Sequence, residues 1–291
     1  MPRPFGRTGL SVSPLGLGAG ELGADELDDR EAEALLRVAV DRGVTLIDTA
    51  RSYGSSEARI GRFLAPVRDA VVLSTKVGYG VDGVDDWTGA CVRLGVDRAL
   101  GLLATDRIDI VHLHSCPIEV LERGDVIAAL HDARRAGKVR CAAYSGDNEP
   151  LEWAAASGQF DSLQLSWNLC DQRAGSVIDR AHQAGLGVIA KRPLANAPWR
   201  FADRPIGHEA ELYWLRWREL AFDPGELTWD ELAARFAAHH AGISSAIIGT
   251  RRAAHLAHNA ELVARGPLPP PVIDAMRARF QAIGADWSAR I

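Results

Sequence analysis

Lysine is scarce in this sequence, which contains only Lys76, Lys138 and Lys191 and otherwise relies on arginine for positive charge. Long hydrophobic runs are also missing, and the N-terminal stretch MPRPFGRTGL lacks the apolar segment of a signal peptide. The formal net charge of −5 is mild and gives no polycation that would bind nucleic acid. We therefore expect neither a membrane-bound protein nor a nucleic-acid-binding one.

Cysteine is present at four scattered positions without any C-x-x-C spacing, namely Cys91, Cys116, Cys141 and Cys170. Disulfide frameworks and structural zinc sites use closely spaced or paired cysteines. We therefore expect reduced thiols in a cytoplasmic protein, without a bound metal.

Short apolar segments alternate with amphipathic ones along most of the chain. The apolar segments have the length and boundaries of buried strands, and they cover residues 44–48, 70–76, 108–114, 139–145, 161–167, 186–191, 243–249 and, least obviously, 12–18. Several of the intervening segments end at a glycine, as helices often do. Eight strand–helix units predict an α/β protein, a (β/α)₈ TIM barrel formed by one domain over residues 1–291. A doubly wound sheet remains the alternative from the same alternation.

Two segments do not fit this regular alternation. Residues 192–227 exceed an ordinary strand-to-helix loop and predict a long loop after the seventh strand, passing over one end of the barrel. The proline-rich stretch after Gly266 predicts a C-terminal extension.

The sequence GAGELG at residues 18–23 matches the dinucleotide-binding pattern G-x-G-x-x-G. That pattern should follow a strand and open a helix directly. Here a helix is expected only from about Asp29, so we interpret the stretch as a loop after the first strand.

Three predicted strands end on ionisable residues, namely Asp48, Lys76 and His114, and Tyr53 lies on the loop after the first of these. Each has an ordinary explanation: a helix cap, a surface charge, a core histidine and a packing aromatic. In a barrel, however, the carboxyl ends of all strands share one face, where active sites lie. Together they predict a proton-transfer site.

The chemistry of these four residues is complementary. A phenol holds its proton tightly in water, and a neighbouring ammonium favours the phenolate. Lys76 is the candidate for that ammonium, and its burial requires a counter-charge such as Asp48. Tyr53 would then protonate a developing alkoxide as a general acid, and His114 would hydrogen-bond the reacting oxygen.

The ordered segments DTARSYG, STKVG, DIVHLH, GKVRCAAYSG and LQLSWN resemble the aldo-keto reductase family, and the resemblance extends over nearly the whole chain. It implies a (β/α)₈ barrel that binds a nicotinamide cofactor without a dinucleotide-binding motif. The catalytic tetrad of the family then corresponds to Asp48, Tyr53, Lys76 and His114.

The same resemblance implies a set of cofactor contacts. Ser145 and Gln164 match residues that hold the nicotinamide amide, although Gly146 stands where asparagine is usual and Asn148 is a candidate substitute. The other implied cofactor-binding residues are Gly18, Lys191, Arg192, Pro193, Leu194, Gly249, Thr250, Arg251, His255 and Asn259. Thr250 and Arg251, with the adjacent Arg252, offer groups for a 2′-phosphate, so we expect NADPH, with NADH possible.

Lys191 stands where the family commonly has an aromatic residue packing on the nicotinamide ring. Either its ammonium or the neighbouring Arg192 guanidinium would repel an oxidised, positively charged nicotinamide more than the neutral reduced ring.

Trp87, Cys116 and Trp199 are candidates for the substrate pocket, with ordinary core packing as the alternative. His112 and His114 form an H-x-H pair on one strand face, but no carboxylate set completes a metal site.

The predicted function is transfer of a hydride between NADP(H) and an aldehyde, ketone or sugar carbonyl or alcohol. The alternatives are an NADPH-binding sensor or regulatory protein with a vestigial site, an enzyme that works mainly as a sugar or alcohol dehydrogenase, and a metal-dependent barrel hydrolase. The expected partner is a small carbonyl compound, and the sequence leaves the oligomeric state open.

Overall fold

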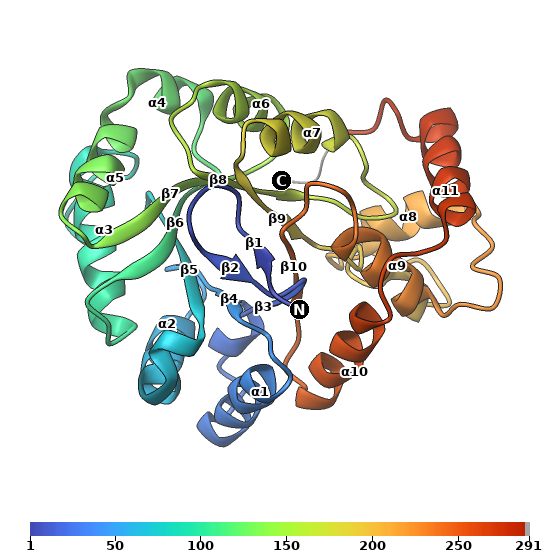
Figure 1. The fold of residues 1–291 in the computed structure, drawn as a ribbon, viewed down its shortest axis with the longest axis horizontal. Helices are drawn as coiled ribbons and strands as arrows, with labels where there is room; N and C mark the ends of the chain where they lie inside the picture. The colour runs from blue at the N-terminus through green and yellow to red at the C-terminus, as the bar shows by residue number, and fades with distance from the viewer. Residues whose placement is uncertain (289–291) are drawn as a thin grey trace.

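A computed structural model describes residues 1–288 of the chain. Eight parallel strands form a closed barrel in the order β10-β3-β4-β5-β6-β7-β8-β9, which confirms the predicted (β/α)₈ architecture (Figure 1). The strands are β3 (Leu15–Gly18), β4 (Leu46–Asp48), β5 (Val72–Val77), β6 (Ile108–His114), β7 (Val139–Ser145), β8 (Ser162–Ser166), β9 (Gly187–Lys191) and β10 (Ser245–Gly249).

Helices surround the barrel and connect successive strands (Figure 1). They are α1 (Asp29–Asp41), α2 (Ser56–Leu64), α3 (Gly89–Leu102), α4 (Ile118–Arg123), α5 (Asp125–Arg135), α6 (Asn148–Ala156), α7 (Gly175–Gln183), α8 (Glu211–Leu220), α9 (Trp229–Ala238), α10 (Ala253–Ala264) and α11 (Pro270–Ile283). Helix α1 starts with a capping box between Asp28 and Glu31, so residues 18–23 precede the helix and do not open it. Within residues 1–288, no helix combines the length and apolarity required to cross a bilayer.

The predicted first strand, residues 12–18, divides into two parts. Strand β2 (Ser11–Val12) pairs with β1 (Arg3–Pro4) in a small antiparallel hairpin. The barrel strand β3 begins only at Leu15. The chain turns at Ser13 and Pro14, where the Ser13 hydroxyl donates to the Leu15 carbonyl. The hairpin lies over the centre of the ring of strands in Figure 1. Its apolar residues Phe5, Leu10 and Val12 pack against inward-facing barrel residues and close that end of the barrel.

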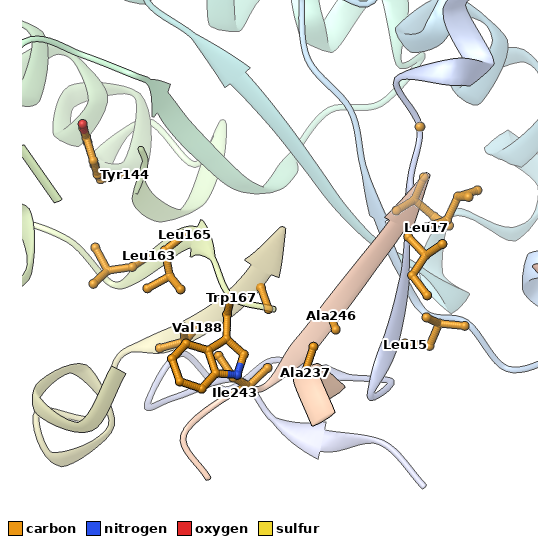
Figure 2. Close-up of a cluster of buried hydrophobic side chains, with 14 of the residues drawn as sticks. Leu15, Leu17, Tyr144, Leu163, Leu165, Trp167, Val188, Ala237, Ile243 and Ala246 are labelled. Carbon is orange, nitrogen blue, oxygen red and sulfur yellow. The ribbon is translucent and has the colours of Figure 1, made fainter. Parts of the chain in front are cut away.

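The two faces of each strand carry different residues. Figure 2 shows the layer between strands and helices, where Leu15 and Leu17 of β3 and Leu163 and Leu165 of β8 lie with Trp167 and Ala237. Because side chains alternate along a strand, the intervening residues point into the barrel. Leu46, Val72, Ile110 and Ile189 fill the interior near the hairpin. The next inward-facing layer, toward the carboxyl ends of the strands, is polar.

The long segment after β9 contains more structure than the expected loop. It forms a short 3₁₀ turn at Pro198–Arg200 and then α8, before α9 completes the seventh strand–helix unit. The indole of Trp199 anchors this segment, because its Nε1 donates to Asp230 at 2.9 Å and its ring stacks on Trp229. The expected C-terminal extension forms α11, which packs against α8.

Candidate active site

A cavity of about 770 Å³ lies at the carboxyl ends of the strands. Ten of the residues predicted from the sequence line it: Gly18, Asp48, Tyr53, Arg192, Pro193, Leu194, Gly249, Thr250, Arg251 and His255. They come from β3, β4, β10, the loops that follow β4, β9 and β10, and, for His255, the first turn of α10. The fold thus gathers, on one face, residues that are up to 237 positions apart in the sequence (from Gly18 to His255).

A buried ion pair joins Lys76 and Asp48 at the inner edge of this cavity. The Lys76 Nζ lies 2.6 Å from Asp48 Oδ2, and each side chain is 2% exposed. The Thr49 carbonyl accepts a second hydrogen bond from Nζ at 2.8 Å. Burial opposes the charged form of both residues, but their mutual attraction outweighs it, so the pKa of Asp48 is lowered and that of Lys76 is raised. Both groups therefore stay charged at neutral pH.

The remaining lone pairs of Asp48 are satisfied by neighbouring strands. Ser74 Oγ donates to Oδ1 at 2.6 Å, and Gln164 Nε2 donates to the same oxygen at 2.9 Å. Gln164 in turn accepts a hydrogen bond from Ser145 Oγ at 2.9 Å. Two residues expected to hold the nicotinamide amide, Gln164 and Ser145, thus also position the Asp48 carboxylate, and their contact with a cofactor stays a prediction.

Tyr53 lies on a tightly hydrogen-bonded turn after β4. Its backbone N–H donates to Ala50, its carbonyl accepts from the Ser56 N–H, and the Ser56 hydroxyl continues to the Ala19 carbonyl. The ammonium of Lys76 lies 4.9 Å from the centre of the Tyr53 ring. The Tyr53 phenol also contributes to the raised pKa of Lys76. Tyr53 therefore contacts the buried cation and lines the cavity at the same time.

His114 at the end of β6 faces two aromatic rings. It makes an edge contact with Tyr53 at a centroid distance of 6.2 Å and stacks on Tyr79 at 5.5 Å. Its Nδ1 lies 2.8 Å from the Tyr79 hydroxyl. Burial, followed by the charge of Lys76, lowers the His114 pKa to about 3. The ring is therefore neutral at pH 7 and offers one donor and one acceptor.

His112, the other histidine of the H-x-H pair, lies fully buried inside the barrel. Its Nε2 lies 3.1 Å from Ser74 Oγ, and burial lowers its pKa to about 4. Within residues 1–288, no group of three histidine, cysteine, aspartate or glutamate side chains is arranged to hold a metal ion.

The residues expected to bind a 2′-phosphate, Thr250 and Arg251, lie immediately before α10. Arg251 contacts Glu21 at 3.3 Å and Glu26 at 3.9 Å, so two carboxylates across the cavity balance its charge. Asn259 is buried and donates to the His255 carbonyl, while its Oδ1 has no partner within the described residues. The arginines and histidines that line the cavity fit a ligand that carries phosphates, whereas Asn259 is not among the cavity-lining residues and its contact with a cofactor stays a prediction.

Lys191 is not a free cation. Its Nζ lies 2.6 Å from Asp147 Oδ2, and Asp147 also accepts from the Ser166 backbone N–H at 2.8 Å. Burial lowers the pKa of Lys191, although Asp147 opposes this shift. Because the carboxylate balances the ammonium, the repulsion of an oxidised nicotinamide expected from the sequence is much reduced at this residue.

Gly146 has a steric reason to replace the usual asparagine. A Cβ at this position would lie 2.4 Å from the buried Tyr144 hydroxyl. Asn148, considered as a substitute, instead lines a second, smaller cavity and accepts a hydrogen bond from Arg173 at 2.8 Å.

The three residues proposed for the substrate pocket differ in their surroundings. Trp87 packs on Tyr79 with a centroid distance of 5.7 Å, and Tyr79 in turn stacks on His114. Cys116 is fully buried, and burial raises its thiol pKa to about 12. Trp199 bonds Asp230 and anchors the segment after β9. None of the three is among the cavity-lining residues that the structure describes.

Several residues of the site were not singled out from the sequence: Ser74, Tyr79 and Asp147 in the hydrogen-bond network, and Glu21, Arg200 and His208 in the cavity wall. Ser74 was detectable, because it lies two residues before Lys76 and must face the same way. Tyr79 lies in the loop after Lys76, where position alone does not distinguish a site residue from a packing one.

The fold and these contacts define a (β/α)₈-barrel protein with a Tyr–Lys–Asp–His constellation at the carboxyl ends of its strands. The family model for the aldo/keto reductase family matches residues 14–279. The chain therefore belongs to the aldo/keto reductase family, a family of oxidoreductases.

Named relatives and solved structures agree with this assignment. The chain is 29% identical over 210 residues to L-galactose dehydrogenase of Arabidopsis thaliana, an alignment that covers 66% of this chain and 65% of that protein. It is 27% identical to 6-dehydroglucose reductase of Novosphingobium aromaticivorans, with 89% of both chains covered. A crystal structure assigned to the aldo-keto reductases, from Pseudomonas aeruginosa, matches with a TM-score of 0.74 and 34% identity, covering 91% of this chain and 94% of that one. An aldo-keto reductase from Bacillus halodurans has the same fold, with a TM-score of 0.83 at 23% identity, covering 96% and 95% of the two chains.

Proposed function

We propose that this protein is an NADP(H)-dependent oxidoreductase that interconverts an aldehyde, ketone or sugar carbonyl and the corresponding alcohol. The observation that carries this proposal is the buried Lys76–Asp48 pair beside the Tyr53 phenol at the edge of a large cavity. Burying an ion pair carries a desolvation penalty, so such a pair is weak evidence for stability alone. Its position next to a phenol in a cavity indicates instead that it tunes the proton affinity of that phenol.

The cavity suits a nicotinamide dinucleotide. Arg192, Arg200, Arg251 and His255 line it and offer donors for the phosphates. Thr250 and Arg251 are the candidates for a 2′-phosphate, and this favours NADPH, although the carboxylates facing Arg251 make a direct comparison with NADH necessary. When bound, the reduced nicotinamide supplies a hydride to the carbonyl carbon.

The protein's own residues handle the proton. The Tyr53 hydroxyl donates its proton to the oxygen of the carbonyl as that oxygen gains negative charge. The Lys76 ammonium stabilises the phenolate that remains, and Asp48 keeps Lys76 protonated within the buried site. Neutral His114, next to Tyr53, hydrogen-bonds the same oxygen and orients the carbonyl. In the direction of alcohol oxidation, the same groups act in reverse.

Sugars are the first substrates to test, because two of the named relatives are a dehydrogenase and a reductase of sugars. Wild-type protein should be assayed with NADPH and NADH against a panel of aldoses, keto-sugars, aldehydes and simple ketones. NADPH binding without turnover of any member would favour the alternative of a cofactor-binding sensor.

The decisive variant is Tyr53→Phe, which keeps the ring but removes the proton. Turnover should fall by about 10²–10⁴-fold, the usual contribution of general acid catalysis. The dissociation constant of NADPH, measured by fluorescence titration, should stay close to the wild-type value. Near-normal turnover in this variant would contradict the assigned role of Tyr53.

A further inference from the structure

Tyr79 makes the only side-chain hydrogen bond that the described residues offer to His114. Its hydroxyl lies 2.8 Å from His114 Nδ1, and the two rings stack with an interplanar angle of 24°. Tyr79 belongs to the loop after β5, whereas His114 ends β6, so the contact links two neighbouring strand ends.

The loop holds Tyr79 from two sides. Arg51 Nε donates to the Tyr79 carbonyl at 3.2 Å, and the Trp87 ring lies against the Tyr79 ring. Gly78 allows this packing, because it has a φ of +132° and a Cβ there would lie 2.3 Å from the Trp87 ring. The Trp87 backbone N–H also donates to the Gly78 carbonyl at 2.7 Å. The phenol is thus placed by the surrounding structure and does not depend on His114 for its position.

The direction of the hydrogen bond follows from the chemistry of the two groups. A neutral imidazole has one N–H donor and one basic nitrogen that accepts well, whereas a phenol is a good donor and a poor base. The Tyr79 hydroxyl also lies 3.3 Å from Ser52 Oγ, but a serine hydroxyl can itself donate across that longer contact, so the phenol proton goes to the more basic Nδ1 at 2.8 Å. The proton of the ring must then reside on Nε2, because the bond made by one ring nitrogen sets the protonation of the other.

We propose that Tyr79 is a positioning residue, which holds His114 in the tautomer with its proton on Nε2 so that the ring donates a hydrogen bond to the carbonyl oxygen of the substrate. This inference rests on the proposed function, in which His114 orients that oxygen. Among residues 1–288, Nε2 of His114 has no hydrogen-bond partner, so its N–H is available to the substrate. With the proton on Nδ1 instead, His114 would donate to the Tyr79 oxygen, and Nε2 would present the substrate with a lone pair that accepts but cannot donate.

The test compares three phenol-to-phenyl substitutions. Tyr79→Phe keeps the stacked ring but removes the donor to His114. Tyr144→Phe is the matched control, because the Tyr144 hydroxyl bonds the Cys116 carbonyl at 3.2 Å within the layer outside the barrel. Tyr53→Phe reports separately on the proposed function.

We expect Tyr79→Phe to lower kcat about tenfold, corresponding to the loss of one well-oriented hydrogen bond. The NADPH dissociation constant should be unchanged, and Tyr144→Phe should keep wild-type turnover. Protein labelled with ¹⁵N-histidine should show His114 with an unprotonated Nδ1 in the wild type and a mixture of tautomers in Tyr79→Phe. The His114 signals can be assigned by their loss in His114→Gln.

Wild-type kcat in Tyr79→Phe, or a protonated Nδ1 in the wild-type spectrum, would overturn the inference. Turnover that falls in Tyr53→Phe but not in Tyr79→Phe would leave the proposed function intact and reject the role of Tyr79. If the wild type converts no carbonyl compound, the proposed function fails. The nitrogen spectrum requires no turnover and then decides by itself whether Tyr79 sets the tautomer.

Discussion

Replacing Asp48 by asparagine removes the counter-charge of a fully buried ammonium. The Lys76 Nζ and the Asp48 carboxylate lie 2.6 Å apart with 2% exposure on each side, so solvent cannot replace the lost partner. Removing one member of such a pair typically costs about 3–5 kcal/mol. Burial then becomes the dominant influence on Lys76, and its pKa should fall below the ordinary 10.5.

A double-mutant cycle separates the ion pair from other effects of Asp48. Lys76→Met alone leaves a buried carboxylate and should destabilise by a comparable amount. The combination of Asp48→Asn with Lys76→Met leaves neither charge and should recover most of the loss, giving a coupling energy of about 3 kcal/mol or more. The free energy of unfolding should be measured by urea denaturation of the cofactor-free protein at neutral pH.

The pH dependence of the coupling energy between Asp48 and Lys76 follows from the direction in which each pKa is shifted. The Asp48 pKa lies below its ordinary 3.8, so the stabilisation by this residue is present above that value and is lost as pH falls through the lowered pKa. The Lys76 pKa lies above 10.5, so its contribution is present below that value and is lost as pH rises through the raised pKa. Single substitutions that each cost less than about 1 kcal/mol and add independently would refute the ion-pair reasoning.

Three further predictions concern residues around this pair. Lys191→Met leaves Asp147 unbalanced and should strengthen binding of NADP⁺ relative to NADPH by about tenfold, or 1.4 kcal/mol; equal fluorescence titrations of both forms would contradict this. Burial lowers the His112 pKa to about 4 in the folded protein, so between about pH 6 and pH 4.5 this histidine is protonated in the unfolded chain but not in the folded one. His112→Gln should therefore reduce the slope of the unfolding free energy against pH in this range by about 1.4 kcal/mol per pH unit. An unchanged slope would exclude burial of a neutral His112 ring. Gly146→Asn should destabilise by about 1–3 kcal/mol through overpacking against Tyr144, and adding Tyr144→Phe should relieve part of that cost in the same denaturation assay.

The barrel was predictable because its strands are short apolar runs separated by amphipathic segments, and a parallel barrel buries both faces of each strand. The placement of Asp48, Lys76 and His114 on one face followed from the same rule, because Asp48 and His114 end their strands and Lys76 is the last residue but one of β5. The hairpin that closes the barrel was not predicted, since residues 3–4 and 11–12 are too short to show any periodicity.

The carboxylates that pair with Lys191 and Arg251 could not be predicted from the sequence, for a different reason. Asp147 lies 44 residues before Lys191, and Glu21 lies 230 residues before Arg251. No local spacing relates such residues, and their pairing depends on how the loops cross the barrel mouth. Lys191 and Arg251 therefore appeared in the sequence as free charges, whereas the structure balances both with carboxylates.

The N-terminal hairpin has a consequence for how the chain matures during synthesis. Phe5 packs against Gly187, and Arg3 donates to the carbonyls of Ala238 and Ile243. The hairpin therefore cannot complete its packing until the chain has been synthesised to about Ile243. Contacts between such distant parts of a chain form slowly, because the chain loses conformational entropy on closing the large loop before the contacts stabilise it. A nascent chain stalled before residue 187 would leave the Phe5 ring without its packing partner Gly187, and the ring would stay exposed to solvent and to chaperones.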